Sequence, residues 1–342
     1  MSIKKNEDQS GETKVICLTP VKNESWILEK FLMAASLWAD HIIVADQLSD
    51  DDSCMIASKF PKVILIKNPS KEFNEPERQK LLIEAARKIE GPRLLITLDA
   101  DEVLTGNFHA SKEWRFVKKA PPGTIIRFKW VNLRPGYKEY WSPDHNFPWG
   151  FMDDGSEHVG EVIHSTRIPM PPTAMTLDLS EIKVLHFQYV DWARMKSKHR
   201  WYQCWETLNR PERSAFEIYK QYHHMYEVKA SDLQRVKEEW FDYYQSNGID
   251  IKAVKEEGIY WWDRQVLEYF QQYGTSRFKK LDIWDAKWGQ LADHFRIDGI
   301  PSLSDPRGMF DKLIHSWLNS GAYNASGVMN GVIRRVLKLF RW

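Results

Sequence analysis

The feature that most constrains this chain is an alternation in its first hundred residues. Short apolar runs, each closed by polar residues, alternate with segments of helical spacing; the apolar runs are 15–18, 42–45, 63–66 and 94–98. Helical spacing covers 25–38 and about 76–90, where Pro76 stands in the first turn and its missing N–H costs nothing. Buried strands separated by helices predict an α/β fold, with a mostly parallel sheet covered on both faces.

Polar residues follow three of these four apolar runs. Thr19 to Glu24 follow the first run, Asp46 to Asp51 the second, and Asp99 and Asp101 the fourth. Ligands of open parallel sheets bind beyond the carboxyl ends of the strands. We therefore expect these residues to share one edge of the sheet and to line one site.

The pair Asp99 and Asp101 is the strongest candidate for a metal site. Two carboxylates two residues apart at a strand end can face the same edge, and carboxylate oxygens suit Mg²⁺ or Mn²⁺. A divalent cation held in this way can stabilise the negative charge of a leaving diphosphate. An isolated Asp-x-Asp is more often a solvated turn, so the interpretation depends on the buried strand before it and on the shared edge.

The ordered set of these motifs resembles the family 2 glycosyltransferases of the GT-A fold over about residues 14–105. The matching segments are Thr19-Pro20-Val21-Lys22-Asn23-Glu24, Asp46-Gln47-Leu48-Ser49-Asp50-Asp51, Arg78-Gln79 and Leu98-Asp99-Ala100-Asp101-Glu102. The resemblance implies nucleotide-sugar contacts from Thr19, Pro20, Asn23, Glu24, Asp46, Asp51, Arg78 and Asp99. It also implies metal ligation by Asp101, with Asp99 reaching the ribose or the metal. His186 would complete the metal shell or contact the diphosphate; the alternative is a structural histidine at a strand end. Gln47-Leu48 departs from the acidic-glycine pair that is usual in the family.

Inverting glycosyl transfer also needs a carboxylate base near the acceptor hydroxyl. Asp153, Asp154 and Glu161 lie in a loop-rich segment, 132–163, where the family places its base. We expect Asp154 to serve, then Asp153, with Glu161 third. The alternative is that these acids only solvate a turn around Gly155.

The second half of the chain predicts a different organisation. Strands are expected at 124–131 and 183–187, and helices at 191–208, 231–246 and 261–273. We expect a flexible tail at 1–14, a catalytic domain at 15–209 and a helical, aromatic-rich region at 210–342. The catalytic domain would divide into a nucleotide-binding half at 15–105 and an acceptor-side half at 106–209.

The last stretch, 328–342, combines an apolar stripe with adjacent cations. Val328, Val332, Val336, Leu339 and Phe340 share one helical face. Such a helix can contact anionic lipid as a peripheral anchor, or it can pack on the protein with its cations in water. We expect packing.

Charge and cysteine content exclude several classes of protein. Lys plus Arg number 48 and Asp plus Glu 47, so no global field favours nucleic acid. The three cysteines form neither a disulfide framework nor a zinc pattern. No apolar run approaches the ~20 residues needed to span a bilayer, and the first residues are too polar for a signal peptide. A cytoplasmic protein is expected, with contact at the inner face of the membrane as a further possibility.

Together these features predict a metal-dependent, inverting glycosyltransferase. It would move a sugar from a nucleoside-diphosphate donor to a hydroxyl acceptor, in the synthesis of a surface glycan or lipopolysaccharide by analogy with the family. Two alternatives stay open: a sugar-phosphate nucleotidyltransferase, and a non-catalytic protein that binds nucleotide sugars. The absence of glycine from Thr19–Glu24 counts against the first alternative.

Overall fold

The computed structural model describes residues 11–324, 328–339 and 342. It divides into two units, and each unit draws on more than one segment of the chain. Unit 1 comprises residues 1–190 and 234–256, and unit 2 comprises 191–233 and 257–342. The predicted tail at 1–14 lies largely outside the described residues; its last residue, Lys14, begins the first strand.

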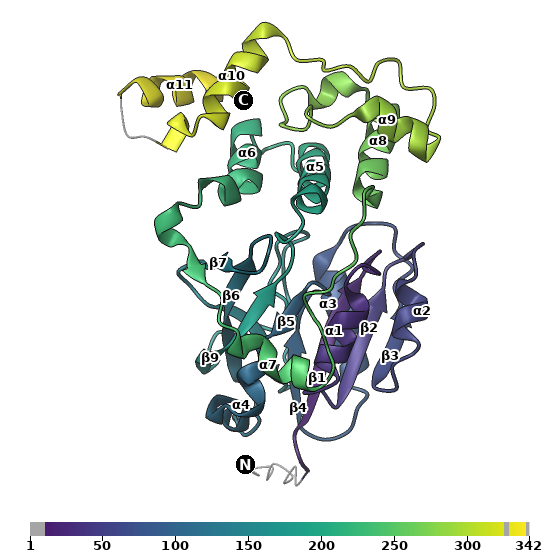
Figure 1. Cartoon of the computed structure of the whole chain (residues 1–342), viewed down its shortest axis with the longest axis vertical. Helices are drawn as coiled ribbons and strands as arrows, with labels where there is room; N and C mark the ends of the chain where they lie inside the picture. The colour runs from purple at the N-terminus through teal and green to yellow at the C-terminus, as the bar shows by residue number, and fades with distance from the viewer. Residues whose placement is uncertain (1–10, 325–327, 340–341) are drawn as a thin grey trace, which may run out of the picture. The chain divides into compact units, whose positions relative to one another are not determined.

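Unit 1 is built on one sheet, which contains ten strands among the described residues (Figure 1). Its strands are β1 (Lys14–Val21), β2 (His41–Asp46), β3 (Val63–Lys67), β4 (Arg93–Thr97), β5 (Glu102–Leu104), β6 (Ile125–Leu133), β7 (Glu139–Trp141), β8 (Phe147–Met152), β9 (Thr176–His186) and β10 (Gln234–Arg235). They are ordered β10-β7-β6-β8-β4-β1-β2-β3, and β9 pairs with both β5 and β6. β1 to β4 are mutually parallel, and the sheet turns antiparallel where β8 joins β4.

Helices cover both faces of the parallel part, as the alternation of strands and helices predicts. Alternate side chains of a strand point to opposite faces. Val15 and Cys17 of β1 share a core with Phe31 of α1 (Leu28–Ala35). Ile16 and Leu18 share the other core with α3 (Glu75–Ala86). The predicted α/β class is confirmed.

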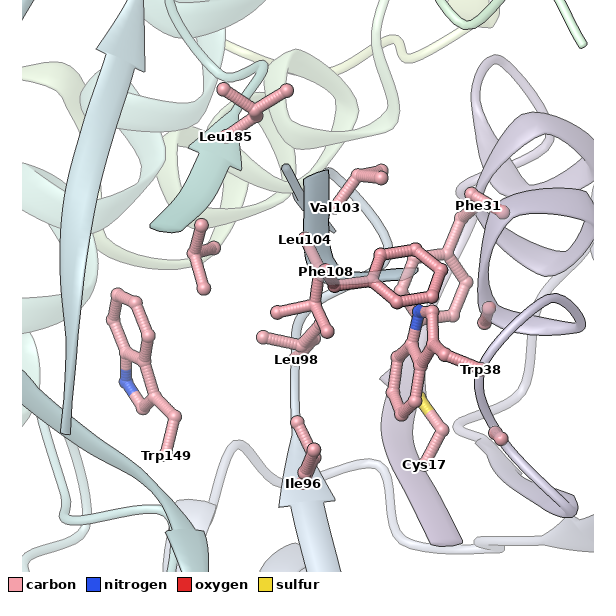
Figure 2. Close-up of a cluster of buried hydrophobic side chains, with 14 of the residues drawn as sticks. Cys17, Phe31, Trp38, Ile96, Leu98, Val103, Leu104, Phe108, Trp149 and Leu185 are labelled. Atoms are coloured by element: carbon pink, nitrogen blue, oxygen red, sulfur yellow. The ribbon is translucent and has the colours of Figure 1, made fainter. Parts of the chain in front are cut away.

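The larger core reaches well beyond the parallel strands. Figure 2 shows Leu98, Val103 and Leu104 between the Phe31–Trp38 side of this core and Trp149. The short elements that contribute to unit 1 are α2 (Ser53–Ala57), η1 (Gly106–His109), α4 (Lys112–Val117) and α7 (Glu239–Ser246). Packing on both sides of Leu98 fixes the segment that carries Asp99 and Asp101.

Unit 2 is helical, as expected for the C-terminal region. It contains α5 (Trp192–Asn209), α6 (Ala215–His223), η2 (His224–Glu227), η3 (Ala230–Asp232), α8 (Trp261–Tyr273), η4 (Thr275–Phe278), α9 (Trp288–Phe295), α10 (Met309–Asn319), η5 (Ala322–Asn324) and α11 (Val328–Leu339). The helix expected at 261–273 has the predicted bounds. The helix expected at 231–246 is shorter, because η3 and β10 occupy its first part.

The last helix packs within unit 2, but by a different face from the one that its sequence suggested. Ile333 and Leu337 join a core with Ile314, Leu318 and Tyr323, whereas Val332 and Val336 are exposed. Phe340 and the side chains of Val328 and Leu339 lie outside what the structure describes. Across the described residues, we find no helix that combines the length and the apolar character required to cross a bilayer. Lipid contact through 328–342 stays a prediction.

Candidate functional site

The carboxyl edge of the parallel strands brings the predicted acids together. Asp46 ends β2 opposite Val21 of β1, and Leu98 extends β4 by donating its N–H to Leu18. Asp99 follows at once. Because β1 alone separates β2 from β4, and strands lie ~4.8 Å apart, the two acids are about 10 Å apart along this edge. A nucleoside diphosphate bound along the edge could reach both.

The two loops that follow β1 and β2 are joined by hydrogen bonds. Asn23 donates from Nδ2 to Asp50 Oδ1 (2.7 Å) and accepts the N–H of Asp50 (2.9 Å). Its φ of 55° lies in the left-handed region, which Asn tolerates better than most residues. Asp51 accepts the backbone N–H groups of Ser25 and Ser53, each at 2.9 Å. The first loop is therefore held in place by the second.

The structure places several predicted nucleotide ligands in structural positions. Burial opposes ionisation of Asp51, but its hydrogen bonds with Ser53 and Ser25 outweigh burial and lower its pKa. Glu24 Oε2 accepts a hydrogen bond from Trp26 Nε1 (2.6 Å). Thr19 and Pro20 lie inside β1, which continues to Val21, so the expectation that the strand ends before them is wrong.

Three of the predicted nucleotide ligands carry buried polar atoms that have no hydrogen-bond partner among the described residues. These atoms are Thr19 Oγ1, Asp46 Oδ1 and Arg78 Nε. Arg78 stands in the first turn of α3, and its guanidinium lies 5.6 Å from the ring of Phe73. Buried polar groups are nearly always satisfied in folded proteins, so each such atom calls for a ligand, a water or an ion. Two of these residues, Thr19 and Asp46, belong to the neighbouring strands β1 and β2.

Asp99 begins a tight turn that Glu102 and Arg167 hold in place. The N–H of Asp99 donates to Glu102 Oε2 (2.9 Å), and the N–H of Glu102 donates to the carbonyl of Asp99 (3.0 Å). Arg167 donates from Nη2 to Asp99 Oδ2 (2.7 Å) and from both terminal nitrogens to the carboxylate of Glu102. The guanidinium also lies 4.9 Å from the ring of Trp149.

The charges of this cluster do not balance. Asp99, Asp101 and Glu102 are three carboxyl groups, and Arg167 is the cation that pairs with two of them. Burial raises the pKa of Glu102 above its ordinary value, although the Arg167 guanidinium works against the shift. In this turn the carboxyl groups outnumber the guanidinium, which favours a cation beside an anionic diphosphate.

Pairing of β5 with β9 brings His186 beside Asp101, although the two residues are far apart in sequence. Glu102 is opposite His186, and the N–H of Phe187 donates to the carbonyl of Asp101 (2.8 Å). His186 Nε2 lies 3.7 Å from Asp101 Oδ2, and Nδ1 lies 2.8 Å from Asn132 Oδ1. The ring of Trp130 stacks on the imidazole at 4.4 Å.

Asp101 and His186 suit a divalent cation. His186 Nε2 and Asp101 Oδ2 lie 3.7 Å apart, and an imidazole nitrogen and a carboxylate oxygen are both common ligands of divalent cations. Second-sphere partners such as Asn132 are typical of metal-binding histidines. Among the residues that the structure describes, no group of three or more His, Cys, Asp or Glu side chains could hold a metal by itself.

Asp153 and Asp154 lie at the wrong edge of the sheet for the predicted base. The N–H of Asp153 donates to the carbonyl of Arg93, the first residue of β4, whereas Asp99 follows the other end of that strand. At ~3.3 Å per residue, the six steps from Arg93 to Asp99 cover on the order of 20 Å. Asp153 is also paired with Arg87 (2.8 Å) and Arg93 (3.1 Å). The assignment of the base to either residue is therefore corrected.

Glu161 belongs to a loop that does reach the carboxyl edge. Its neighbour Val162 accepts the N–H of Glu75 at the start of α3 (3.1 Å), and Arg167 of the same loop contacts Asp99. Ser165 donates its N–H to Glu75 Oε2 (2.7 Å). Glu161 itself is exposed. Of the three predicted bases, Glu161 is the one whose loop contacts the edge that holds Asp99.

The sequence interpretation missed Arg167, Glu102 and Asn132 as members of this cluster. Glu102 stands directly after the Asp-x-Asp motif, so its place in the turn could have been expected. Arg167 carries no local signal, because it lies in an irregular loop (153–175) between β8 and β9. Asn132 lies within β6, and its contact with His186 depends on the pairing of β6 with β9.

Neither a family model nor a curated protein matches this chain. Solved structures that it resembles include glucosyl-3-phosphoglycerate synthase from Mycobacterium tuberculosis in complex with Mg²⁺ and uridine-diphosphate, at 16% identity over 36% of this chain, with a TM-score of 0.28. Another is 4-diphosphocytidyl-2C-methyl-D-erythritol synthase, at 17% identity over 41% of this chain and 75% of that one, with a TM-score of 0.29.

A third similar structure is HddC from Yersinia pseudotuberculosis, at 11% identity over 51% of this chain and 93% of that one, with a TM-score of 0.30. The matched part of this chain spans 45% of the length of the mycobacterial synthase. Any functional assignment therefore rests on the residues at the carboxyl edge of the sheet.

Proposed function

We propose that this protein is a glycosyltransferase that binds a nucleoside-diphosphate sugar and Mg²⁺ or Mn²⁺ at the carboxyl edge of β1, β2 and β4. The observation that carries the proposal is that Asp46, which has a buried oxygen without a partner among the described residues, ends β2 while Asp99 and Asp101 follow the parallel strand β4 at the same edge. Arg78 also has a buried nitrogen without a partner among the described residues, and Asp99 lies about 10 Å from Asp46 along the edge. This spacing suits a ligand with a nucleoside at one end and a diphosphate at the other.

Each part of the cluster has a distinct role in the proposed reaction. Asp46 and Arg78 hold the nucleoside, while Asp101 and His186 hold the cation, with Asp99 beside them. When bound, the cation stabilises negative charge on the departing diphosphate. Arg167 keeps Asp99 and Glu102 in place, because it bonds to both carboxylates.

The transfer itself exchanges one bond to the anomeric carbon for another. The bond from that carbon to the diphosphate oxygen breaks, and its electron pair leaves with the diphosphate. The acceptor oxygen forms the new bond from the opposite face, with inversion, and its proton passes to a carboxylate oxygen. Glu161 is the candidate for this base, since its loop reaches the edge. A glycan or lipopolysaccharide-type acceptor is the first class to test.

Thermal unfolding in the presence of nucleoside diphosphates and their sugars tests the donor site. A ligand at a hundred times its Kd adds about 2.7 kcal/mol of stability, which corresponds to about 5–10 °C. We expect such a shift with Mn²⁺ and a smaller one without it. Asp101→Asn should abolish the Mn²⁺-dependent part, whereas Asp154→Asn, an exposed acid at the opposite edge, should keep it.

The absence of any shift with every nucleotide, or an undiminished shift in Asp101→Asn, would contradict the proposal. Turnover separates the two alternatives from transfer. Pyrophosphate release from a nucleoside triphosphate and a sugar phosphate would identify a nucleotidyltransferase. Donor binding without transfer or hydrolysis over an acceptor panel would identify a binding protein. Retention of full turnover in Glu161→Gln would exclude Glu161 as the base.

A further inference from the structure

Unit 2 contains a pocket that the proposed transfer reaction does not use. It encloses about 350 Å³ and is formed by α5, α6, Tyr226 of η2, the segment that holds Asp282 and Asp285, and Asn319 at the end of α10. All of these residues belong to unit 2. The volume is at the lower end of the range for small-molecule sites. What this pocket could bind follows from its polar groups, its rings and its charges.

The pocket presents hydrogen-bonding groups that have capacity to spare. Gln203 is buried and accepts the N–H of Asp282 at its Oε1 (3.3 Å), while its amide NH₂ has no partner among the described residues. Asn319 accepts the hydroxyl of Tyr219 (2.7 Å), which leaves its own NH₂ available. The hydroxyl of Tyr226 likewise makes no hydrogen bond within the described part of the chain. Two amide groups and a phenol hydroxyl of this pocket can therefore bond to a ligand.

Aromatic rings form part of the pocket wall. Tyr219 stacks on the imidazole of His223 at 3.8 Å and 10°. His223 is itself held, because Nδ1 lies 2.9 Å from the carbonyl of Tyr219 and Nε2 lies 2.8 Å from Asp282 Oδ2. Tyr226 leans on His223 at 5.7 Å and remains 51% exposed. The ring of Trp192 lies 5.3 Å from Tyr226, so Tyr226 is supported by two rings and is still partly open to solvent.

The charged groups of the pocket compensate one another. Lys196 Nζ lies 3.5 Å from Asp285, and Arg200 lies 3.8 Å from Asp285 and 2.9 Å from Asp263. Asp282 lies 2.8 Å from His223, 3.7 Å from His315 and 3.9 Å from the guanidinium of Arg307. A phosphate would have to displace these carboxylates, whereas a neutral ligand would leave the pairs intact. The absence of a surplus charge favours a neutral ligand with many hydroxyl groups.

We propose that this pocket binds a neutral saccharide, with one sugar ring on Tyr226 and hydroxyls bonded to Gln203, Asn319 and Asp285. Sugar hydroxyls both donate and accept, which matches the mixture of amide donors and a carboxylate acceptor. The apolar C–H face of a pyranose suits an aromatic ring with one wet edge. This proposal goes beyond the transfer reaction and does not rest on it.

Saturation-transfer NMR on the full chain, without nucleotide or metal, tests the proposal. The probes are neutral hexoses, N-acetylhexosamines and their disaccharides at tens of millimolar, with inorganic phosphate as the anionic competitor. We expect at least one saccharide to bind saturably, and phosphate not to displace it. Tyr226→Ala should weaken that binding about tenfold, as the loss of a central aromatic contact commonly does.

Tyr273→Ala is the matched control. Tyr273 is 47% exposed in the same unit and does not line the pocket, so its removal should change the Kd less than about twofold. Circular dichroism and thermal unfolding confirm that both variants are folded. Three results would each overturn the proposal: no saccharide binds the wild-type protein, Tyr226→Ala binds as well as Tyr273→Ala, or phosphate displaces the saccharide.

Discussion

The guanidinium of Arg167 is largely buried, and it forms ion pairs with two carboxylates of unit 1. It pairs with Asp99 and Glu102, and Glu102 is completely buried. Removing one partner of a buried pair leaves the other charge uncompensated, which costs more than the pair itself contributes. The same guanidinium keeps Asp99 next to the proposed cation site. Stability and function thus depend on one side chain.

The first prediction concerns this pair. Arg167→Met should lower the free energy of unfolding by about 3–5 kcal/mol, because it leaves the buried carboxyl group of Glu102 without its cation. The double variant Arg167→Met/Glu102→Leu should recover a large part of the loss. Arg127→Met removes a comparable but exposed pair with Asp178 and should cost at most about 1 kcal/mol. Urea unfolding measures all three, and equal losses in Arg167→Met and Arg127→Met would contradict the prediction.

The second prediction concerns pH. Burial opposes ionisation of Asp153, but Arg87, the N–H of Gly155 and Arg93 outweigh burial and lower its pKa. Because its pKa is lower in the folded state, ionised Asp153 stabilises the fold at pH values above its unfolded-state pKa of about 3.9. This stabilisation is lost as the pH falls through the folded-state pKa. Asp153→Asn should therefore cost about 2–3 kcal/mol at pH 7 and progressively less below about pH 4.

Urea unfolding of wild type and Asp153→Asn from pH 7 to about pH 3 measures this difference. Asp154→Asn is the control, because Asp154 is exposed and bonds only locally, to the N–H of Ser156. Its cost should stay within about 0.5 kcal/mol throughout. If the difference in unfolding free energy between the wild type and Asp153→Asn does not change with pH, then Asp153 does not stabilise the fold through its charge.

At the residue scale, the sequence was informative where a side chain stands next to a strand end. Asp46, Asp99 and Asp101 could be placed on one edge because parallel strands align their carboxyl ends. Asp153 could not be placed correctly, because its position depends on β8 running antiparallel to β4. Arg167 could not be found at all, since its partners lie more than sixty residues away.

At the scale of elements, the parallel strands and their helices could be predicted, whereas the pairing of the later strands could not. β1 to β4 carry continuous apolar runs, which are typical of strands buried on both faces. β5, β7 and β10 are two or three residues long and have no periodicity to detect. The start of β9 was missed because Thr176–Ile182 is largely polar and exposed. The pairing of β5 with β9 nevertheless brings His186 to Asp101.

The third prediction tests how α7 is held in unit 1. Tyr244 donates its buried hydroxyl to the carbonyl of Leu104 (2.6 Å), two residues before Gly106. A Cβ at Gly106 would lie 2.9 Å from the carbonyl of Trp240, so the two segments are closely packed. Tyr244→Phe should lower the free energy of unfolding by about 1–3 kcal/mol, because it leaves that carbonyl unsatisfied.

Tyr243→Phe is the matched control for Tyr244→Phe. The ring of Tyr243 stacks on His109 at 3.9 Å, but its hydroxyl makes no hydrogen bond within the described residues. Removing that hydroxyl should change the unfolding free energy by no more than about 0.5 kcal/mol. Chemical denaturation distinguishes the two variants, and equal effects would mean that the Leu104 contact contributes no measurable stability.

At the scale of the whole molecule, the two units are interleaved along the chain. We expected the catalytic domain to end at 209, but α5 belongs to unit 2, and residues 234–256 return to unit 1. The return has a physical cause: Trp240, Phe241, Tyr244, Ile249 and Ile251 are buried in the main core of unit 1. Helical spacing at 239–246 shows that one face is apolar, but it does not show which core that face joins.

The fourth prediction follows from this arrangement. A chain that ends at Val190 lacks β10, α7 and the five apolar side chains that complete the core, so it should be aggregated or only partly folded. Fully burying a large apolar side chain contributes about 1.5–3 kcal/mol, so the loss of five, about 7.5–15 kcal/mol, is comparable to the whole 5–15 kcal/mol by which domains are ordinarily stable. Joining residues 234–256 to Val190 through a flexible Gly/Ser linker should restore a cooperative thermal transition. Circular dichroism and size-exclusion chromatography compare the two chains. Cooperative unfolding of the shorter chain would show that the sheet does not need the returning segment.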